Sequence, residues 1–475
     1  MLLFAPTTEA AEPTVTVTFT DRAGAPATRA DVTLLNPTTN DYLTAESDGG
    51  VATIDAPPGE YVLWATVHTG RSEASLLMWP HFEVTGSTTV ELDARVARPI
   101  EVRVPHRNAR VAAVVVLANL SWTSDGEGRG AAAVVSTADA PKVSTAQLGS
   151  GESLDMLHTR VKINLAEPDP ATSPYLYALR FDRPGGMFTG LRETVRPADV
   201  TASRVDYAAL GANRDGVTGS FDVGDGMNQV VGVPIALPRS RTEYHSKNVT
   251  WETTLCYGDT CLSGPLSPRW NYGPFLPNAQ LIERMGDRLR IIAGIADQAG
   301  HRGLAESDLR DGRFTLYRDG VKMAETPVDQ PGFDGLPAEK ARYRIEFDGS
   351  FATLLPGTFH AAWTFESDRE SGVLPALNVR FTPRLDPTNH APPAGRPLTL
   401  PIEVTGGQAT TLTVDVSFDA GVTWQPVRVR PSGSGWVTQV TPPAGAADIS
   451  LRAHAADAAG NTVDQTMTRA IPLVS

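Results

Sequence analysis

Cysteine and lysine are scarce in this chain of 475 residues, which has two cysteines and five lysines. No apolar run approaches the roughly 18 residues of a membrane-spanning helix, so the sequence predicts no membrane span. The net charge is −13, without a cluster of Lys or Arg. That balance argues against nucleic acid and anionic membranes as partners.

The motifs of the common enzyme classes are also missing. The sequence has no G-x-S-x-G, no HExxH, no P-loop and no G-x-G-x-x-G after a strand. Its nine histidines are scattered, and none has a second His or a Cys beside it. Asp125, Glu127, Asp222 and Asp225 lie in glycine-rich loops that lack the alternating ligand spacing of a calcium loop. We therefore interpret these loops as turns and predict no catalytic residue, no cofactor site and no metal site.

Turn-forming residues are abundant instead. The chain has 42 glycines and 37 prolines, above the average usage of about 7% and 5%. Residues 14–20 alternate strictly between apolar residues and threonine, as a half-buried strand does. Similar short strands recur at spacings near ten residues with turn signals between them. We predict an all-β chain of several β-sandwich domains in tandem, of Ig-like or prealbumin-like type.

Composition suggests where the domains end. The residues from Arg384 to Pro397 include four prolines, which indicates a linker. The predicted parts are a leader or truncated segment at 1–12, a sandwich at 13–97, β-rich domains at 98–240 and 241–385, a proline-rich linker at 386–397, and a C-terminal Ig-like sandwich at 398–475.

Two local patterns refine this outline. Residues 281–295 fit either helical spacing or strands interrupted by Gly286-Asp287, and we favour strands. Asp319-Gly320 between two apolar runs is a strong hairpin signal.

Met1 to Ala5 is apolar but has no basic residue before it and meets Pro6, so it is not a complete signal peptide. The chain is then either part of a longer exported protein or carries a short leader on a cytoplasmic one.

Cys256 and Cys261 bracket four residues that include Gly258-Asp259. If that dipeptide forms a two-residue hairpin turn, the cysteines face each other one pair further from the turn. The separation of their Cα atoms would suit a disulfide, which we favour. Two free thiols remain an alternative, and so does a metal site, although only His245 lies near as a further ligand. A disulfide fits an exported protein, because such bonds persist in oxidising compartments.

One motif is specific. Residues 417–424 match S-x-D-x-G-x-T-W, the Asp-box, with Ser417, Asp419, Gly421, Thr423 and Trp424 at its defining positions. We interpret it as a structural hairpin in which Asp419 caps turn amides, Gly421 takes a positive φ and Trp424 packs under the loop. A single copy does not support a propeller active site. Seven tryptophans are candidates either for a sugar-binding face or for core anchors, and we favour core anchors: Trp64, Trp79, Trp251, Trp270, Trp363, Trp424 and Trp436.

Residues 14–472 resemble, in order, the C-terminal region of secreted actinobacterial subtilisin-like serine peptidases. The stretches that carry the resemblance include residues 57–61, 269–275, 316–321, 362–365, 379–386, 417–424 and 457–463. Residues 14–97 are also similar to carboxypeptidase-regulatory, transthyretin-like modules, through Asp48-Gly49 and Pro57-Pro58-Gly59-x-Tyr61. The Asp, His and Ser motifs of the peptidases are absent, and His68-Thr69-Gly70 is not their His motif. The resemblance implies a secreted, extracellular, peptidase-associated β-region and assigns no catalytic residue.

Three functions compete at this point. The first is a non-catalytic exported β-sandwich protein that stabilises, spaces or positions a peptidase domain, or binds its protein substrate or the cell envelope. The second is a carbohydrate-binding or adhesion protein that uses an exposed tryptophan on a cell-wall glycan. The third, which we disfavour, is a peptidase with an unfamiliar site.

Overall fold

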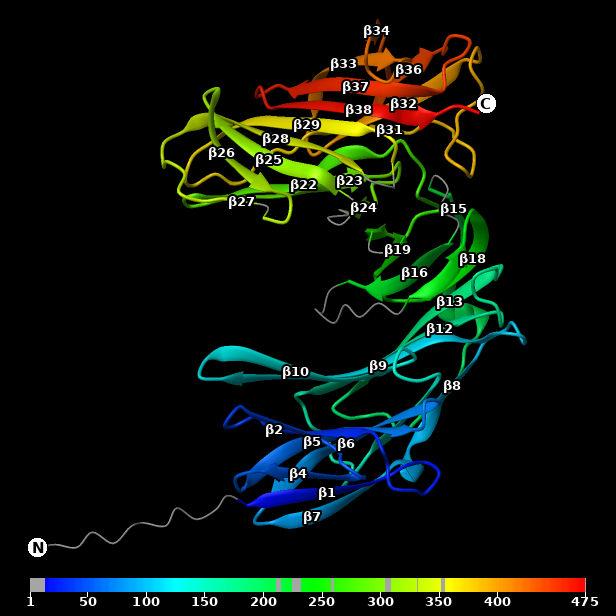
Figure 1. Ribbon diagram of the computed structural model, residues 1–475, viewed down its shortest axis with the longest axis vertical. Coiled ribbons are helices and arrows are strands. Elements are labelled where there is room, and N and C mark those ends of the chain that lie inside the picture. The colour runs from blue at the N-terminus through cyan, green and yellow to red at the C-terminus, as the bar shows by residue number, and fades with distance from the viewer. Residues whose placement is uncertain are drawn as a thin grey trace, which may run out of the picture. The chain divides into compact units, whose positions relative to one another are not determined.

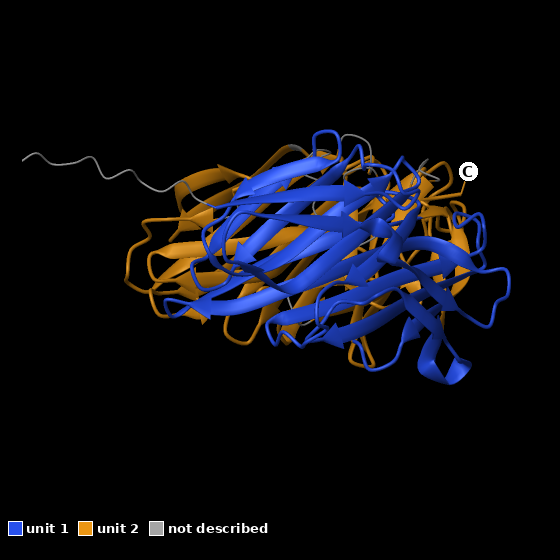
Figure 2. Ribbon diagram, turned by 90° about the horizontal axis from the view of Figure 1, so that it is seen from below, with its two compact units in different colours: residues 1–202, 224–233, 243–249 blue, residues 203–223, 234–242, 250–475 orange. Residues whose placement is uncertain are grey.

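The computed structural model describes residues 13–210, 215–223, 232–257, 260–303, 309–330, 332–351 and 355–474. The chain divides into two compact units, shown in different colours in Figure 2. Unit 1 comprises residues 1–202, 224–233 and 243–249, and unit 2 comprises residues 203–223, 234–242 and 250–475. Each is built almost wholly of strands (Figure 1).

The described residues of unit 1 form fourteen complete strands and two short 3₁₀ turns. They are β1 (Thr14–Thr20), β2 (Ala30–Asn36), β3 (Asp41–Glu46), β4 (Val51–Asp55), β5 (Gly59–Thr69), β6 (Glu73–Val84), β7 (Thr88–Asp93), η1 (Ala94–Val96), β8 (Arg98–Arg103), β9 (Arg110–Ser124), β10 (Glu127–Ser136), β11 (Lys142–Gln147), β12 (Leu157–Ala166), β13 (Tyr175–Pro184), β14 (Leu191–Thr194) and η2 (Pro197–Asp199). The strands β15 (Val200–Tyr207), β17 (Val233–Ala236) and β18 (Arg239–Ser246) have residues in both units.

The central layer of unit 1 is a seven-stranded sheet in the order β14-β8-β11-β6-β5-β2-β3. One face packs on the three-stranded sheet β4-β1-β7, where Val15, Val17 and Phe19 are buried together with Leu63. The other face packs on β9, β12 and β13 in a second core. Because both faces are covered, β5 and β6 are apolar almost without interruption rather than alternating.

Unit 2 contains the remaining strands. They are β16 (Asp215–Asp222), β19 (Trp251–Tyr257), β20 (Thr260–Pro265), β21 (Arg269–Trp270), β22 (Leu276–Met285), β23 (Arg288–Ala296), β24 (Arg302–Gly303), β25 (Leu309–Arg318), β26 (Val321–Pro327), β27 (Gly332–Phe333), β28 (Ala341–Phe351), β29 (Thr358–Ser367), β30 (Gly372–Val373), β31 (Asn378–Phe381), β32 (Leu398–Thr405), β33 (Ala409–Ser417), β34 (Gln425–Val427), β35 (Arg430–Ser432), β36 (Gly435–Val440), β37 (Asp448–Asp457) and β38 (Thr462–Pro472).

Three sheets of unit 2 enclose one continuous core. An eight-stranded sheet in the order β26-β25-β28-β29-β38-β37-β33-β34 contributes Phe314, Ile345 and Trp363. The sheet that contains β22 and β23 contributes Ile282 and Ile291, and the four-stranded sheet β31-β32-β36-β35 closes the remaining side. The eight-stranded sheet joins strands from before and after the proline-rich residues 386–397. The individual domain boundaries remain predictions.

The expected all-β class of several β-sandwiches is confirmed. Residues 281–295 form strands, as favoured, because Gly286 adopts a positive φ of 64° in the turn that joins β22 to β23. The Asp319-Gly320 hairpin is also confirmed, with φ values of 50° and 81° at the two turn residues. Asp225, one of the acidic residues in the glycine-rich loops, lies outside the described residues.

Candidate functional site

The outward face of the eight-stranded sheet in unit 2 carries a surface groove of about 680 Å³. We call it the polar groove. The residues that line it are Tyr317, Gly320, Arg342, Tyr343, Arg344, Glu346, Thr364, His454 and Thr462. They come from β25, the turn after it, β28, β29, β37 and β38.

Strand alternation explains which of the groove-lining side chains face outward. In β28, Tyr343, Ile345 and Phe347 are fully buried against the core. Arg344 and Glu346 lie between them in sequence, so they point to the opposite face of the sheet. The same alternation in β29 buries Trp363 and turns Thr364 outward.

The strand register aligns the groove residues into rows. Glu346, Ala362, Asp464 and His454 occupy one row across β28, β29, β38 and β37. Ala362 is on the outward face but is 0% exposed.

Charges in the groove are paired. Arg344 donates from Nε to Glu346 Oε1 at 2.9 Å and from Nη1 to Asp464 Oδ2 at 2.9 Å. His454 Nδ1 lies 2.7 Å from Asp464 Oδ1. Burial alone would raise the pKa of Asp464, but its hydrogen bonds with His454 and Arg344 hold that pKa below the usual range. Burial and the nearby Glu346 raise the pKa of Tyr317, which keeps its hydroxyl protonated.

The next row repeats the motif. His360 Nδ1 lies 2.8 Å from Asp348 Oδ1, and this hydrogen bond raises the pKa of His360. Arg452, further along the sheet, donates to Asp415. The outward face of the sheet therefore carries hydrogen-bond donors, hydrogen-bond acceptors and side chains of both charges, arranged in rows across the strands. Such a surface can hold an extended polar ligand by many hydrogen bonds.

The residues of the Asp-box motif form one hydrogen-bonded turn after β33. Asp419 Oδ1 accepts from Ser417 Oγ at 2.6 Å and from Thr423 N at 2.9 Å, while Gly421 N donates to Ser417 Oγ. The hydrogen bonds from Ser417 and Thr423 lower the pKa of Asp419 to about 2. Gly421 has a φ of 90°. Trp424 is half-buried, and the guanidinium of Arg452 lies 4.7 Å from its ring centroid.

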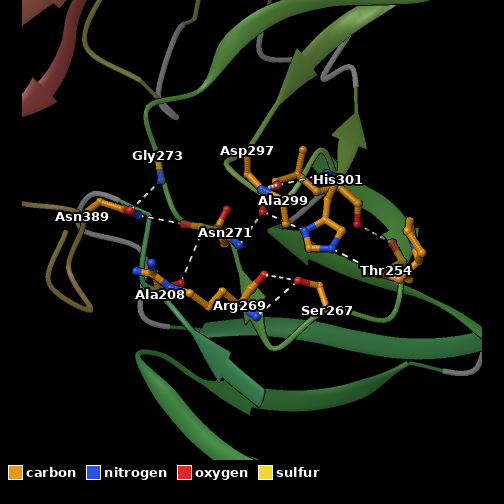
Figure 3. Close-up of polar contacts among 12 residues, drawn as sticks. Ala208, Thr254, Ser267, Arg269, Asn271, Gly273, Asp297, Ala299, His301 and Asn389 are labelled. Atoms are coloured by element: carbon orange, nitrogen blue, oxygen red, sulfur yellow. Dashed lines mark hydrogen bonds and ion pairs between the residues drawn. The ribbon is translucent and has the colours of Figure 1, made fainter. Parts of the chain in front are cut away.

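A second polar cluster in unit 2 is closed to solvent (Figure 3). His301 Nδ1 lies 2.8 Å from Asp297 Oδ2, and its ring stacks on Trp270 with centroids 3.4 Å apart. Asp297 Oδ2 also accepts from Asn271 N at 2.8 Å. His301 is 0% and Asp297 1% exposed. The pair therefore joins the chain around residue 271 to the turn at 297–301 and cannot meet a substrate in this conformation.

The network extends through buried amides. Asn389 accepts from Gly273 N at 2.7 Å and donates to the carbonyls of Asn271 and Ala209 at 2.9 and 3.0 Å (Figure 3). Gln298 donates to the carbonyls of Gly273 and Pro383. These contacts satisfy backbone groups that would otherwise be buried without partners. Sequence analysis missed this cluster because its members, from Ala209 to Asn389, lie up to 180 residues apart.

Cys256 and Cys261 are joined by a disulfide, with Cα atoms 4.0 Å apart. They are a facing pair of β19 and β20, and Tyr257 faces Thr260 one step nearer the turn, as the spacing predicts. The turn residues 258 and 259 lie outside the described part of the chain. The bond therefore cross-links the two strands of this hairpin next to its turn.

The tryptophans divide into two groups. Trp64, Trp251, Trp270 and Trp363 are buried. Trp79, Trp424 and Trp436 are half-buried. An eighth, Trp122, was not among the candidates, and its indole N–H donates to Asn40 Oδ1 at 2.9 Å.

Within the described ranges, no three His, Cys, Asp or Glu side chains are grouped closely enough to hold a metal ion. No helix in those ranges is long and apolar enough to cross a membrane.

No family model and no curated protein matches the chain. A chimeric titin Z1Z2-Z1Z2 tandem is 14% identical, covering 40% of this chain and 96% of that one, with a TM-score of 0.16. The alpha-2-macroglobulin of E. coli is 8% identical, covering 99% of this chain and 40% of that one, with a TM-score of 0.19. The four N-terminal Ig domains of Dscam1 isoform 4.44 are 8% identical, covering 96% and 97%, with a TM-score of 0.12. These TM-scores are too low to carry any argument, and the all-β class rests on the strands of this chain.

Proposed function

We propose that this chain is a non-catalytic, exported β-sandwich binding protein. It acts as an accessory region of a subtilisin-like serine peptidase and holds an extended stretch of protein substrate in the polar groove. The observation that carries the proposal is the groove itself. It lies on an open sheet face, where paired charges, hydroxyl groups and Tyr317 are arranged in rows that follow the strand register.

The composition of the groove supports binding rather than acyl transfer. His454 with Asp464 resembles the base and orienting carboxylate of a hydrolytic triad. The described residues that line the groove include no serine or cysteine to act as the nucleophile. Asp464 of this pair also accepts a hydrogen bond from Arg344, which stabilises the charge of the carboxylate.

The link to a peptidase rests on the sequence resemblance over residues 14–472. An unfolded polypeptide is a ligand that suits the groove, because its amides alternate donors and acceptors and its side chains carry both signs of charge. The disulfide supports export, since such bonds persist in oxidising compartments.

Half-buried Trp424 favours a second candidate, binding of a cell-wall glycan. Its ring lies against Arg452, and Arg452 pairs with Asp415 on the outward face of β33. An aromatic ring beside charged hydrogen-bonding groups is an arrangement that can hold a sugar ring.

Binding assays on the full chain separate these candidates. Fluorescein-labelled casein, followed by anisotropy, should bind the wild-type chain, and Tyr317→Ala with Arg342→Ala should weaken binding at least tenfold. Tyr42→Ala with Arg29→Ala makes a matched control, because Tyr42 is 54% exposed and both residues lie in unit 1.

The outcomes decide between the two ligands. Equal casein binding by the wild type and the groove variant, or no binding at all, would overturn the groove as a polypeptide site. Sedimentation with insoluble cell-wall glycan that is lost in Trp424→Ala, together with absent casein binding, would establish the second candidate instead.

A further inference from the structure

The connection from β8 to β9 in unit 1 surrounds a surface pocket of about 320 Å³. The residues that line it are Val102, Arg103, Val104, His106, Arg107, Ala109 and Arg110. Three guanidinium groups and one imidazole therefore border a single pocket in a chain whose net charge is −13. We call these four side chains the basic pocket.

The arginines of the basic pocket have no acidic partner. Arg110 Nη1 donates to the carbonyls of Ala109 at 2.8 Å and of Arg107 at 3.4 Å. Within the part of the chain that the structure describes, no carboxylate lies within ion-pair distance of Arg103, Arg107 or Arg110.

Neighbouring arginines on β14 and after it behave differently. Arg192 pairs with Glu101 at 3.2 Å, and Arg196 pairs with Asp199 at 2.9 Å. Both of these arginines therefore have acidic partners, which the arginines of the basic pocket lack among the described residues.

A stack of aromatic rings holds one wall of the pocket in place. His106 Nδ1 lies 2.7 Å from the hydroxyl of Tyr177, and the imidazole stacks on Tyr175 with centroids 4.0 Å apart. Tyr177 in turn stacks on Tyr244 at 4.4 Å. Tyr175 donates to Asn108 Oδ1 at 2.8 Å, which fixes the same loop from its other side.

These contacts pre-organise the pocket. Burial and the neighbouring tyrosines raise the pKa of Tyr177 to about 12, so its hydroxyl stays neutral beside His106. Glu167 accepts a hydrogen bond from Asn108 Nδ2 at 2.9 Å rather than pairing with an arginine. The loop is therefore held at His106 and Asn108 by contacts to β13, and the three exposed arginine side chains extend from it toward solvent.

We propose that the basic pocket binds a phosphate group carried by a ligand of this protein. Guanidinium groups present paired donors that match the oxygens of phosphate and carboxylate. Three of them exceed what one carboxylate can neutralise, whereas a phosphate monoester carries a charge of about −1.5 to −2 at pH 7. The proposal does not rest on the polar groove, whose residues belong to unit 2.

Calorimetric titration of the full chain with inorganic phosphate and with pyrophosphate, at low ionic strength, tests this proposal. The wild type should bind both, and the triple variant Arg103→Gln, Arg107→Gln, Arg110→Gln should weaken binding at least tenfold. The matched control is Arg29→Gln, Arg71→Gln, Arg129→Gln. It removes three exposed arginines of the same unit and changes the net charge equally, so its affinity should stay within twofold of wild type.

Four results would overturn the proposal. Equal weakening in both triple variants would show that only net charge matters. Absence of heat with either phosphate probe would show that the pocket takes no phosphate. Tighter, pocket-dependent binding of polygalacturonate than of polyphosphate would make the site one for carboxylates, and preference for duplex DNA would make it a nucleic-acid site.

Discussion

Asp182 on β13 accepts hydrogen bonds from three side chains on one sheet of unit 1. Its Oδ1 accepts from Arg160 Nε at 2.8 Å and from His158 Nε2 at 2.9 Å, and its Oδ2 accepts from Arg180 Nε at 2.7 Å. Burial alone would raise the pKa of Asp182, but the hydrogen bonds from Arg180, His158 and Arg160 lower it to about 2. Arg160 is 1% exposed, so its charge depends on partners inside the protein.

Asp182→Asn should therefore lower the free energy of unfolding at pH 7 by about 1–3 kcal/mol, the usual cost of losing hydrogen bonds to charged groups. Because the pKa of Asp182 is lowered on folding, its contribution is present above the unfolded value of 3.8 and is lost as the pH falls through about 2. Urea denaturation of wild type and variant at several pH values measures this. The difference should shrink between pH 4 and pH 2 for Asp182→Asn and should be absent throughout for exposed Asp155→Asn.

Ion pairs of this kind join residues of different strands, and such pairings cannot be predicted from the sequence alone. Alternation in β28 predicts that Arg344 and Glu346 share the outward face. It does not say that Asp464, 120 residues later, will lie opposite them, because that contact depends on β29 pairing with β38. The three arginines of the basic pocket are close in sequence, and their spacing within residues 103–110 was a signal that could have been found.

At the scale of elements, the short disulfide in the β19–β20 hairpin gives a second prediction. Replacing both cysteines, Cys256→Ser and Cys261→Ser, should lower the free energy of unfolding by about 2 kcal/mol, because the closed loop no longer restricts the unfolded chain. Guanidinium denaturation of the oxidised wild type and of the double variant measures the difference. Thiol titration of the unfolded, unreduced protein should find no free thiol, and two free thiols would contradict the bond.

Individual strands and turns were easier to predict from the sequence than the strands with which they pair. Turn chemistry marked the hairpin at Asp319-Gly320, and alternation marked β1, because both signals depend on neighbours in the sequence. β9 packs in the second core of unit 1 against residues of distant strands, which no local pattern indicates. The polar groove needed five strands to assemble before its residues met, so composition could not reveal it.

At the scale of the whole molecule, the two compact units carry different surface chemistry. The polar groove of unit 2 balances its charges internally, through Arg344, Glu346 and Asp464. The basic pocket of unit 1 leaves its charges unpaired. Each site has its own variant, so the two sites are tested independently.

The last prediction concerns the chain as a possible enzyme. Acyl transfer by serine needs a nucleophile, a histidine, an orienting carboxylate and oxyanion donors that converge within hydrogen-bond distances. The groove provides His454 with Asp464 but is not lined by a described serine, and a further pair, His301 with Asp297, is buried under Trp270. We expect a serine-directed fluorophosphonate probe to leave the purified chain unlabelled, and casein to remain uncleaved beyond a heat-treated control. Stoichiometric labelling of one serine, abolished by His454→Gln, would instead show that the groove is the active site of a peptidase, because only an activated nucleophile reacts with such a probe.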